Sequence, residues 1–341
     1  MQRRGVCGIY RKSRSHRSAA DGVVAHKSHF VRATTPSAPF GRGPFFEGAA
    51  TPPLQGGETQ TRNSFTRPLA RVENGDIAMH EYEYQAMYGL EDSYWWFVAR
   101  RILAEEFVGS AVNGRREPRI LDIGCGTGAN MKTFGRHGMT AGIDTSMEAL
   151  HFCQKRGLQT VAVSAVERLP FADAAFDVIT ALDVLEHTDD DLDALREIRR
   201  VARDEALLLI AVPAYGFLWS EHDEALKHRR RYTAYELRNK LTVTGYEVMR
   251  TTYFITTLFF PILALRFWQG LFKKSTHPKT SLKILPAWLN ESLIGLLWIE
   301  RQILKWMNLP FGVSVIALAR PSRPSSMSPA SVHAAKYDGG G

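Results

Sequence analysis

Residues 120–128, Ile-Leu-Asp-Ile-Gly-Cys-Gly-Thr-Gly, constrain the fold more than any other stretch of the chain. A short apolar run, interrupted only by Asp122, leads directly into three glycines at alternate positions. Glycine has no Cβ and accepts positive φ, so such a turn lets a ligand come close to the backbone. The residues that follow, 129–137, are predicted to form a helix. A strand, a glycine turn and a helix in this order form the nucleotide-cofactor corner of an open α/β sheet.

The charge and the spacing of this corner favour a cationic cofactor over a dinucleotide. Dinucleotide sites favour G-x-G-x-x-G, whereas the glycines here are Gly124, Gly126 and Gly128. Asp122 would repel a pyrophosphate, but it suits the ammonium group of S-adenosylmethionine (SAM), which also carries a sulfonium. Asp144 ends the next apolar run, 22 residues after Asp122. That is about the separation at which an acid reaches ribose hydroxyls.

Three further segments extend this pattern into a family resemblance. Residues 164–171 read Ser-Ala-Val-Glu-Arg-Leu-Pro-Phe, residues 176–187 end in Asp-Val-Leu-Glu-His, and residues 91–97 read Glu-Asp-Ser-Tyr-Trp-Trp-Phe. Residues 79–320 resemble the class I SAM-dependent methyltransferases, in the branch called methyltransferase type 11. The first two segments are similar to the adenine-side loop and to the fourth strand of that family. The third resembles a subgroup with His-Trp-Trp-Phe, although Tyr94 replaces the His.

Alternating strand and helix patterns predict an α/β fold. Strands are expected at about 119–123, 139–144, 158–163, 176–182, 205–212, 246–254 and 313–320, and helices at about 129–137, 146–156, 190–202 and 233–244. Such a chain forms a Rossmann-like, mostly parallel sheet with helices on both faces. The resemblance adds that the sheet has seven strands and that the last strand is antiparallel. Ser146 is the expected cap of the helix that follows it.

A strongly apolar insertion, 255–312, separates the last two strands, which would otherwise form a near-hairpin. Its first part is about as long as a membrane span, but Pro261, Arg266 and Gln269 interrupt it. A central charge disfavours membrane insertion by roughly 2.5–3.5 kcal/mol. Three interpretations stay open: a transmembrane helix, a helix pair in 255–307 that touches a bilayer or a lipid-like substrate, and a hydrophobic lid.

The formal net charge of +8 belongs to the ends of the chain. Residues 1–78 carry 12 Lys/Arg against 5 Asp/Glu, whereas residues 79–320 carry 29 of each. This distribution argues against a nucleic-acid partner. The basic extension 1–78 and the tail 321–341 are predicted to be disordered. We hypothesise that the natural product begins near Met79, with an organellar transit peptide as the alternative.

The cysteines indicate the compartment. Three cysteines without metal-ligand spacing predict a reducing, cytoplasmic environment, without a disulfide framework and without a metal site. The apolar insertion adds the expectation of a peripheral contact with a membrane.

Residues that follow the strands at the carboxyl edge of the sheet are the candidates for binding, because ligands of open parallel sheets lie there. With the resemblance, the cofactor-binding candidates are Asp122, Gly124, Cys125, Gly126, Gly128, Asp144, Thr145, Ala165, Val166, Glu167, Asp183 and Val184. His187 and His222 are the candidate general bases, since an imidazole titrates near neutrality. Alternatively, His187 caps or braces the helix that begins near residues 189–191. The substrate-binding candidates are Tyr215, Trp219, Asp223, Arg229, Arg230 and Tyr232.

These observations predict an enzyme that moves a methyl group from SAM to a small or lipid-linked acceptor. The basic run 227–231 favours an anionic acceptor, and the apolar insertion favours an amphiphilic one. Two other functions stay open. One is an NAD-type Rossmann oxidoreductase, against which Asp122 and the glycine spacing weigh. The other is a non-catalytic SAM-binding protein that associates with a membrane. Neither the acceptor nor the oligomeric state follows from the sequence.

Overall fold

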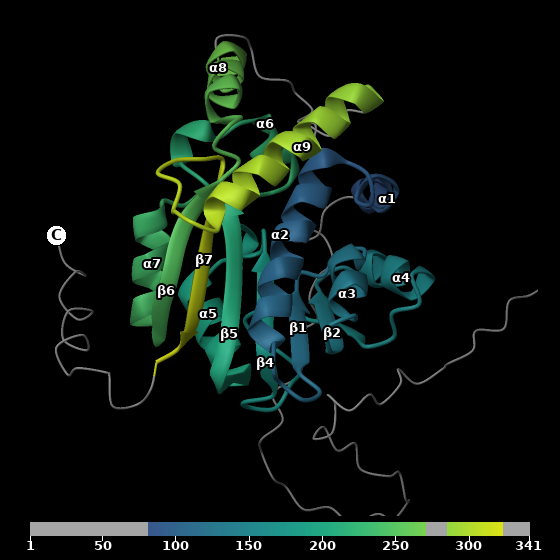
Figure 1. The fold of residues 1–341 in the computed structure, drawn as a ribbon. Helices are drawn as coiled ribbons and strands as arrows, with labels where there is room; N and C mark the ends of the chain where they lie inside the picture. The colour runs from purple at the N-terminus through teal and green to yellow at the C-terminus, as the bar shows by residue number, and fades with distance from the viewer. Residues whose placement is uncertain (1–80, 271–284, 323–341) are drawn as a thin grey trace, which may run out of the picture. The chain divides into compact units, whose positions relative to one another are not determined.

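The computed structural model describes residues 81–270 and 285–322, which fold around a seven-stranded sheet (Figure 1). The strands are β1 (Arg119–Ile123), β2 (Met139–Asp144), β3 (Val161–Val163), β4 (Phe176–Leu182), β5 (Ala202–Pro213), β6 (Tyr246–Phe254) and β7 (Ser314–Pro321). Their order is β3-β2-β1-β4-β5-β7-β6. Strands β1 to β5 are parallel, whereas β7 is antiparallel to both β5 and β6. The predicted fold class, including the antiparallel last strand, is confirmed. The predicted extension 1–78 lies outside the described residues, as does the predicted tail beyond residue 322.

Helices cover both faces of the sheet, as predicted. They are α1 (Glu81–Leu90), α2 (Trp95–Val112), α3 (Ala129–Phe134), α4 (Met147–Lys155), α5 (Asp191–Val201), α6 (Glu221–Ala225), α7 (Ala234–Val243), α8 (Phe259–Gly270) and α9 (Ala287–Leu304), with 3-10 turns η1 (Leu185–His187) and η2 (Gly216–Leu218). Successive strand residues point to opposite faces. Leu121 therefore joins the core that includes residues of α5 and α7, while Ile120 joins the core that includes residues of α2 and α9.

Local hydrogen bonds explain where the helices begin. The Ser146 side chain accepts a hydrogen bond from the Ala149 N–H at 3.3 Å, so the predicted cap of α4 is confirmed. Helix α5 is capped by Asp190, whose carboxylate accepts from two N–H groups of the first turn at 2.9 and 3.0 Å. The capping role that was considered for His187 is therefore filled by Asp190.

Two predicted elements are shorter than expected, for local reasons. The strand expected from residue 158 begins at Val161, because the Leu158 N–H bonds back to the Cys153 carbonyl and closes the end of α4. The helix expected over 129–137 ends at Phe134, where Gly135 begins a turn. Both shifts shorten an element and leave the order of elements unchanged.

The apolar insertion contributes α8 and α9, and buried polar contacts attach it to the domain. Glu300 of α9 is buried and accepts hydrogen bonds from the N–H groups of Thr256 and Thr257, each at 3.0 Å. Asn290 of α9 accepts from the Trp95 N–H at 2.9 Å and donates to the Ser93 carbonyl. In Figure 1, α9 lies against α2. Among the helices of the described ranges, none has the length and the apolar character of a membrane span.

We expect Glu300→Ala to lower the free energy of unfolding by about 1–3 kcal/mol, because the donors of residues 256 and 257 lose a charged acceptor. Urea denaturation followed by circular dichroism measures this change. The matched control is Glu291→Ala, an exposed glutamate of the same helix, for which a change within about 0.5 kcal/mol is expected. Equal denaturation midpoints for the two variants would contradict the anchoring role of Glu300.

Candidate cofactor and active site

The turn between β1 and α3 has backbone conformations that glycine adopts readily. φ is +65° at Gly124, +53° at Gly126 and +89° at Gly128. A Cβ on Gly124 would lie 2.6 Å from Val184 Cγ2, and one on Gly128 would lie 2.6 Å from Leu158 Cδ1. The turn therefore packs directly against the residues that follow β4 and α4, and side chains at these positions would not fit.

Asp122 brings an incompletely satisfied carboxylate to this corner. It is 1% exposed, and one of its oxygens accepts a hydrogen bond from Thr180 Oγ1 at 2.6 Å. The other oxygen, Oδ2, has no hydrogen-bond partner within the described residues. Burial raises the pKa of Asp122 to about 7, although the Thr180 hydrogen bond and the charge of Arg100 lower it. A buried carboxylate of this kind favours a cationic ligand.

Asp144, at the end of β2, holds the glycine turn in place. Its two oxygens accept hydrogen bonds from the Gly126 N–H and the Ser146 N–H, each at 2.9 Å. Burial raises the pKa of Asp144, and these backbone donors oppose that effect. Because a carboxylate has about four acceptor positions, Asp144 can also accept from ribose hydroxyls. Thr145 follows it and is exposed.

The remaining cofactor candidates follow β3 and β4. Ala165 and Glu167 are exposed, whereas the Val166 side chain is buried in the core. Only the backbone of Val166 is therefore available to an adenine. Asp183 has a positive φ of 57° and forms an ion pair with Arg100 of α2. β1, β2, β3 and β4 are neighbours in the sheet, so the cofactor candidates lie at adjacent strand ends.

Glu91 covers the glycine turn from the aromatic segment 91–97. It is buried, accepts a hydrogen bond from Arg156 Nη2 at 2.6 Å, and also accepts from the Thr127 hydroxyl. Burial raises its pKa. The Arg156 guanidinium also donates to the Thr127 carbonyl at 3.0 Å. Sequence reasoning assigned no role to Glu91 or Arg156, and the only available signal was the acid at the start of the segment.

Three imidazoles gather beyond η1. The ring centroids of His187 and His228 lie 4.8 Å apart, and those of His222 and His228 lie 6.3 Å apart. Burial, and then the charge of His228, lower the pKa of His187 to about 3 and that of His222 to about 4. Both candidate bases are therefore neutral at pH 7 but weak as proton acceptors. Sequence reasoning missed His228, which it treated only as part of the basic run.

The basic run 227–231 is largely paired inside the protein. Arg231 binds both oxygens of Asp223, at 2.8 and 3.0 Å, Arg230 lies 3.1 Å from Asp191, and Arg229 pairs with Asp189. Acids on α6 and on or just before α5 thus pair with these guanidinium groups, and a role of Arg229 and Arg230 in binding an anionic acceptor stays a prediction.

Asp223 and Tyr232 are also occupied within the fold. Asp223 is fully buried, and donors on His228 and Arg231 outweigh its burial and hold its pKa well below the usual range. Tyr232 is buried and donates to Asp191 Oδ2 at 2.9 Å. These contacts stabilise the loop, and an additional role of Asp223 and Tyr232 in binding the acceptor stays a prediction.

Tyr215 and Trp219 remain available as acceptor contacts. Both are half-buried. Tyr215 stacks between Phe217 and Tyr253, with ring centroids at 4.9 and 5.1 Å, and its ring meets that of Phe259 at 5.8 Å. Because Phe259 begins α8, this aromatic wall joins the loop after β5 to the apolar insertion.

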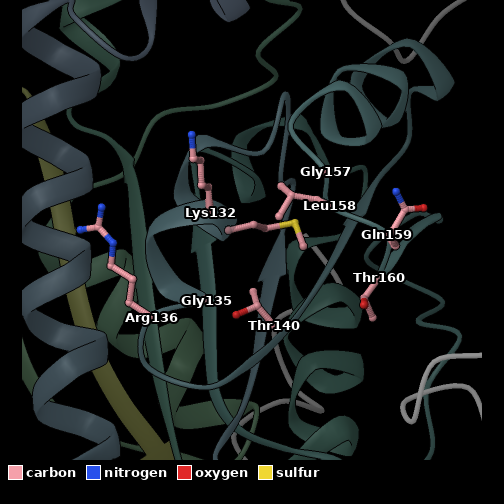
Figure 2. Close-up of a pocket in the computed structure, with 9 residues that line it drawn as sticks. Lys132, Gly135, Arg136, Thr140, Gly157, Leu158, Gln159 and Thr160 are labelled. Carbon is pink, nitrogen blue, oxygen red and sulfur yellow. The ribbon is translucent and has the colours of Figure 1, made fainter.

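A pocket of about 510 Å³ lies between α3 and the segment that joins α4 to β3 (Figure 2). It is lined by Met131, Lys132, Gly135, Arg136, Thr140, Gly157, Leu158, Gln159 and Thr160. Thr140 is near the start of β2 and Thr160 precedes β3. The pocket therefore lies toward the amino ends of these strands, opposite the edge where cofactors bind in parallel sheets.

Residues 121–210 match the methyltransferase domain family. This region belongs to the class I SAM-dependent methyltransferases. The match begins within β1, so it does not test the subgroup that residues 91–97 suggested. SAM is the cofactor of this family, and the corner fits it. Asp122 Oδ2 is an unpartnered buried oxygen suited to the ammonium, Asp144 can accept from the ribose, and the glycine turn lets the cofactor lie against the backbone.

Several curated proteins are similar to part of the chain. The uncharacterized methyltransferase YcgJ of Bacillus subtilis is 34% identical over 124 residues, which are 34% of this chain and 49% of that protein. O-methyltransferase rstn1 of Aspergillus nomiae is 36% identical over 123 residues, or 33% and 54% of the two chains. The ubiquinone biosynthesis O-methyltransferase of Hahella chejuensis is 34% identical over 100 residues, or 27% and 42%. The chain thus spans about half the length of the curated relatives it matches.

Solved structures of other proteins align with this chain at low sequence identity. The plantazolicin methyltransferase BpumL in complex with SAH aligns with a TM-score of 0.46 at 17% identity, over 71% of this chain and 90% of that chain. A SAM-dependent methyltransferase of Thermotoga maritima aligns with a TM-score of 0.43 at 18% identity, over 71% and 96%.

We expect the affinity for SAM to fall as the pH drops below 7. The Asp122 carboxyl has a pKa of about 7 without ligand, and only its ionised form pairs with the ammonium. Below pH 7 the Asp122 carboxyl must lose its proton before it can pair with the ammonium of SAM. The Kd for SAM therefore rises by up to about tenfold per pH unit. Isothermal titration calorimetry between about pH 6 and 8 measures this. Asp122→Asn is expected to bind more weakly, with a flatter pH profile. Parallel profiles for both proteins would refute the assignment.

Proposed function

We propose that this protein transfers the methyl group of SAM to a small, amphiphilic acceptor, such as a polyprenyl- or quinone-type molecule or a glycolipid intermediate. The unpartnered oxygen of Asp122 beside the glycine turn carries the cofactor part of this proposal. The names of two similar proteins, ubiquinone biosynthesis O-methyltransferase and demethylmenaquinone methyltransferase, support the acceptor part. Each of those proteins is matched over only half of its length or less.

The chemistry asks the protein mainly for positioning. SAM supplies, when bound, a methyl group already activated on a sulfonium for in-line displacement. Asp122 and Asp144 would orient the amine and ribose ends, and the glycine turn allows a close approach. The Arg100–Asp183 ion pair holds the end of β4, where the methyl donor would face the acceptor. Such orientation alone accounts for a large part of the rate enhancement in many enzymes.

The aromatic wall supports an acceptor with an apolar body. Tyr215, Phe217 and Phe259 form contiguous ring contacts, and Trp219, in the same loop as Tyr215 and Phe217, is half-buried. Flat aromatic surfaces bind apolar rings and chains with little loss of conformational entropy. This surface leads from the loop after β5 to the insertion.

The outer surface of the insertion supports a peripheral contact with a membrane. Large aromatic side chains are exposed on both of its helices, including Phe267 (72%) on α8 and Trp288 (69%) on α9, with Trp306 (91%) just beyond α9. Large exposed apolar side chains concentrated in one segment mark interaction surfaces. Tryptophan prefers the boundary between lipid and water. A cytoplasmic protein that rests on a membrane surface would reach a lipid-linked acceptor there, and the buried free thiols Cys125 and Cys153 suit a reducing compartment.

We expect the full chain to release S-adenosylhomocysteine and to place label from methyl-labelled SAM in the lipid-extractable fraction of a membrane extract. Thin-layer chromatography of extracts, with a water-soluble metabolite pool as a second arm, measures the distribution. Asp122→Asn should lose most of the transfer because its cofactor affinity falls. Label confined to water-soluble products would contradict the amphiphilic acceptor. Tight SAM binding without transfer to either pool would contradict the enzymatic function.

We expect Phe267→Glu and Trp288→Glu each to weaken binding to vesicles of phosphatidylcholine and phosphatidylglycerol by about tenfold. Burial of such a side chain contributes roughly 1.5–3 kcal/mol, and 1.4 kcal/mol is about a factor of ten. Co-sedimentation with the vesicles gives the bound fraction. Tyr235→Glu is the matched control, because Tyr235 is 73% exposed on α7, outside the insertion. Equal losses in all three variants would contradict a specific role for the insertion.

A further inference from the structure

Glu186 is a buried carboxylate that the fold does not satisfy. Glu186 lies in η1 and is 0% exposed. Neither of its side-chain oxygens has a hydrogen-bond partner in the part of the chain that the structure describes. The nearby guanidinium groups of Arg100 and Arg231 act on it through their charge. Both arginines are paired elsewhere, with Asp183 and Asp223. A buried carboxylate without a partner is costly, so this position calls for a further positive charge.

Two imidazoles face the same point as this carboxylate. Glu186, His187 and His228 each offer one ligand atom, and the three atoms lie within 4.8 Å of one another. Zinc takes ligand nitrogens and oxygens at about 2.0–2.2 Å, which places the ligands of one ion within about 4 Å of one another. Small side-chain rotations therefore suffice to bring all three atoms onto one cation.

Asp223 supplies the supporting contact that metal-bound histidines commonly have. Nδ1 of His228 lies 2.9 Å from Asp223 Oδ1, which leaves Nε2 as the other ring nitrogen. Asp223 is itself held by Arg231 and by the Ser220 N–H, at 2.8 Å. A ligating histidine usually donates its second ring N–H to a carboxylate, which fixes both the tautomer and the ring orientation. The burial of Asp223, which a substrate-binding role does not explain, fits this function.

We propose that Glu186, His187 and His228 bind one divalent transition-metal cation of the Zn²⁺ type at the carboxyl end of β4. Two imidazoles and one carboxylate are a ligand set that zinc and its neighbours accept, whereas Mg²⁺ and Ca²⁺ favour oxygen ligands. Three protein ligands leave at least one coordination position open. The expectation of no metal site rested on cysteine spacing, which does not report on histidines brought together by the fold.

The open position gives the cation a role at the acceptor, and this role rests on the proposed function. An acceptor hydroxyl that binds the cation acquires a lower pKa and releases its proton to solvent. Its oxygen lone pair then forms the carbon–oxygen bond as the methyl–sulfur bond breaks, and the bonding pair stays on sulfur as a neutral thioether. This arrangement removes the need for His187 or His222 to act as a general base.

The test is zinc binding by the full chain in the absence of SAM. After dialysis against a chelator, calorimetric titration with ZnCl₂ is expected to show one strong site per chain. Glu186→Gln and His228→Gln should each weaken that site by at least about tenfold, and Asp223→Asn by about 10–100-fold. His151→Gln is the matched control, because His151 is an exposed histidine of α4, and it should retain the affinity of the unaltered chain.

Further measurements distinguish a misfolded variant from one that has lost only its metal site. They also distinguish failure of the metal site from failure of the proposed function. SAM affinity and circular dichroism identify variants that remain folded. If the variants misfold, Co²⁺ is added to the unaltered chain instead. Co²⁺ held by four or five ligands in the proposed site should absorb visible light much more strongly than the hydrated ion, and absence of this absorption would contradict the site. Absence of stoichiometric zinc binding, or equal weakening in His151→Gln, would overturn the site. Methyl transfer at an unchanged rate after chelation would overturn the role of the cation at the acceptor. The zinc titration does not depend on whether SAM binds, so failure of the metal site and failure of the proposed function are distinguishable.

Discussion

The carboxylate of Asp144 joins the elements on which the cofactor corner depends. One oxygen holds the Gly126 N–H in the turn after β1, and the other holds the Ser146 N–H at the start of α4. Ser146 then caps α4 through the Ala149 N–H. Helix α4 in turn carries Cys153, whose thiol donates to the Gly126 carbonyl at 3.2 Å. The turn is thus fixed from both sides, so its geometry exists before any ligand arrives, which lowers the entropic cost of binding.

A buried carboxyl group without a full set of hydrogen bonds is the common property of the two halves of the site. Asp122 on the cofactor side and Glu186 on the acceptor side each keep a carboxylate oxygen without a hydrogen-bond partner among the described residues. Both pKa values are raised by burial. Fixed carboxylates in a low-dielectric site lower the stability of the fold but bind cations strongly. The ammonium group of SAM would pair with Asp122, and the proposed divalent cation would pair with Glu186.

The sequence predicted what local rules determine. The glycine turn, the strand before it, the helix after it and the Ser146 cap follow from short-range patterns, and each is present in the structure. Contacts between distant segments were not predictable in this way. The basic run 227–231 looked like an exposed patch because its partners, Asp189 and Asp191, lie about 40 residues earlier in the chain. His228 escaped notice for the same reason, since its neighbour His187 belongs to a different loop.

The apolar insertion shows why a single physical role does not describe such a segment. Its inner side is anchored by Glu300 and Asn290, which attach α9 to the start of α8 and to the segment before α2. Its first helix also contributes Phe259 to the aromatic wall beside Tyr215, while its outer side exposes large aromatic residues. A lid needs only the attachment to the domain and the contribution to the aromatic wall, whereas a membrane anchor needs only the exposed aromatic residues. Under the proposed function both belong together, because a lipid-linked acceptor must pass from the exposed aromatic surface to the wall without crossing water.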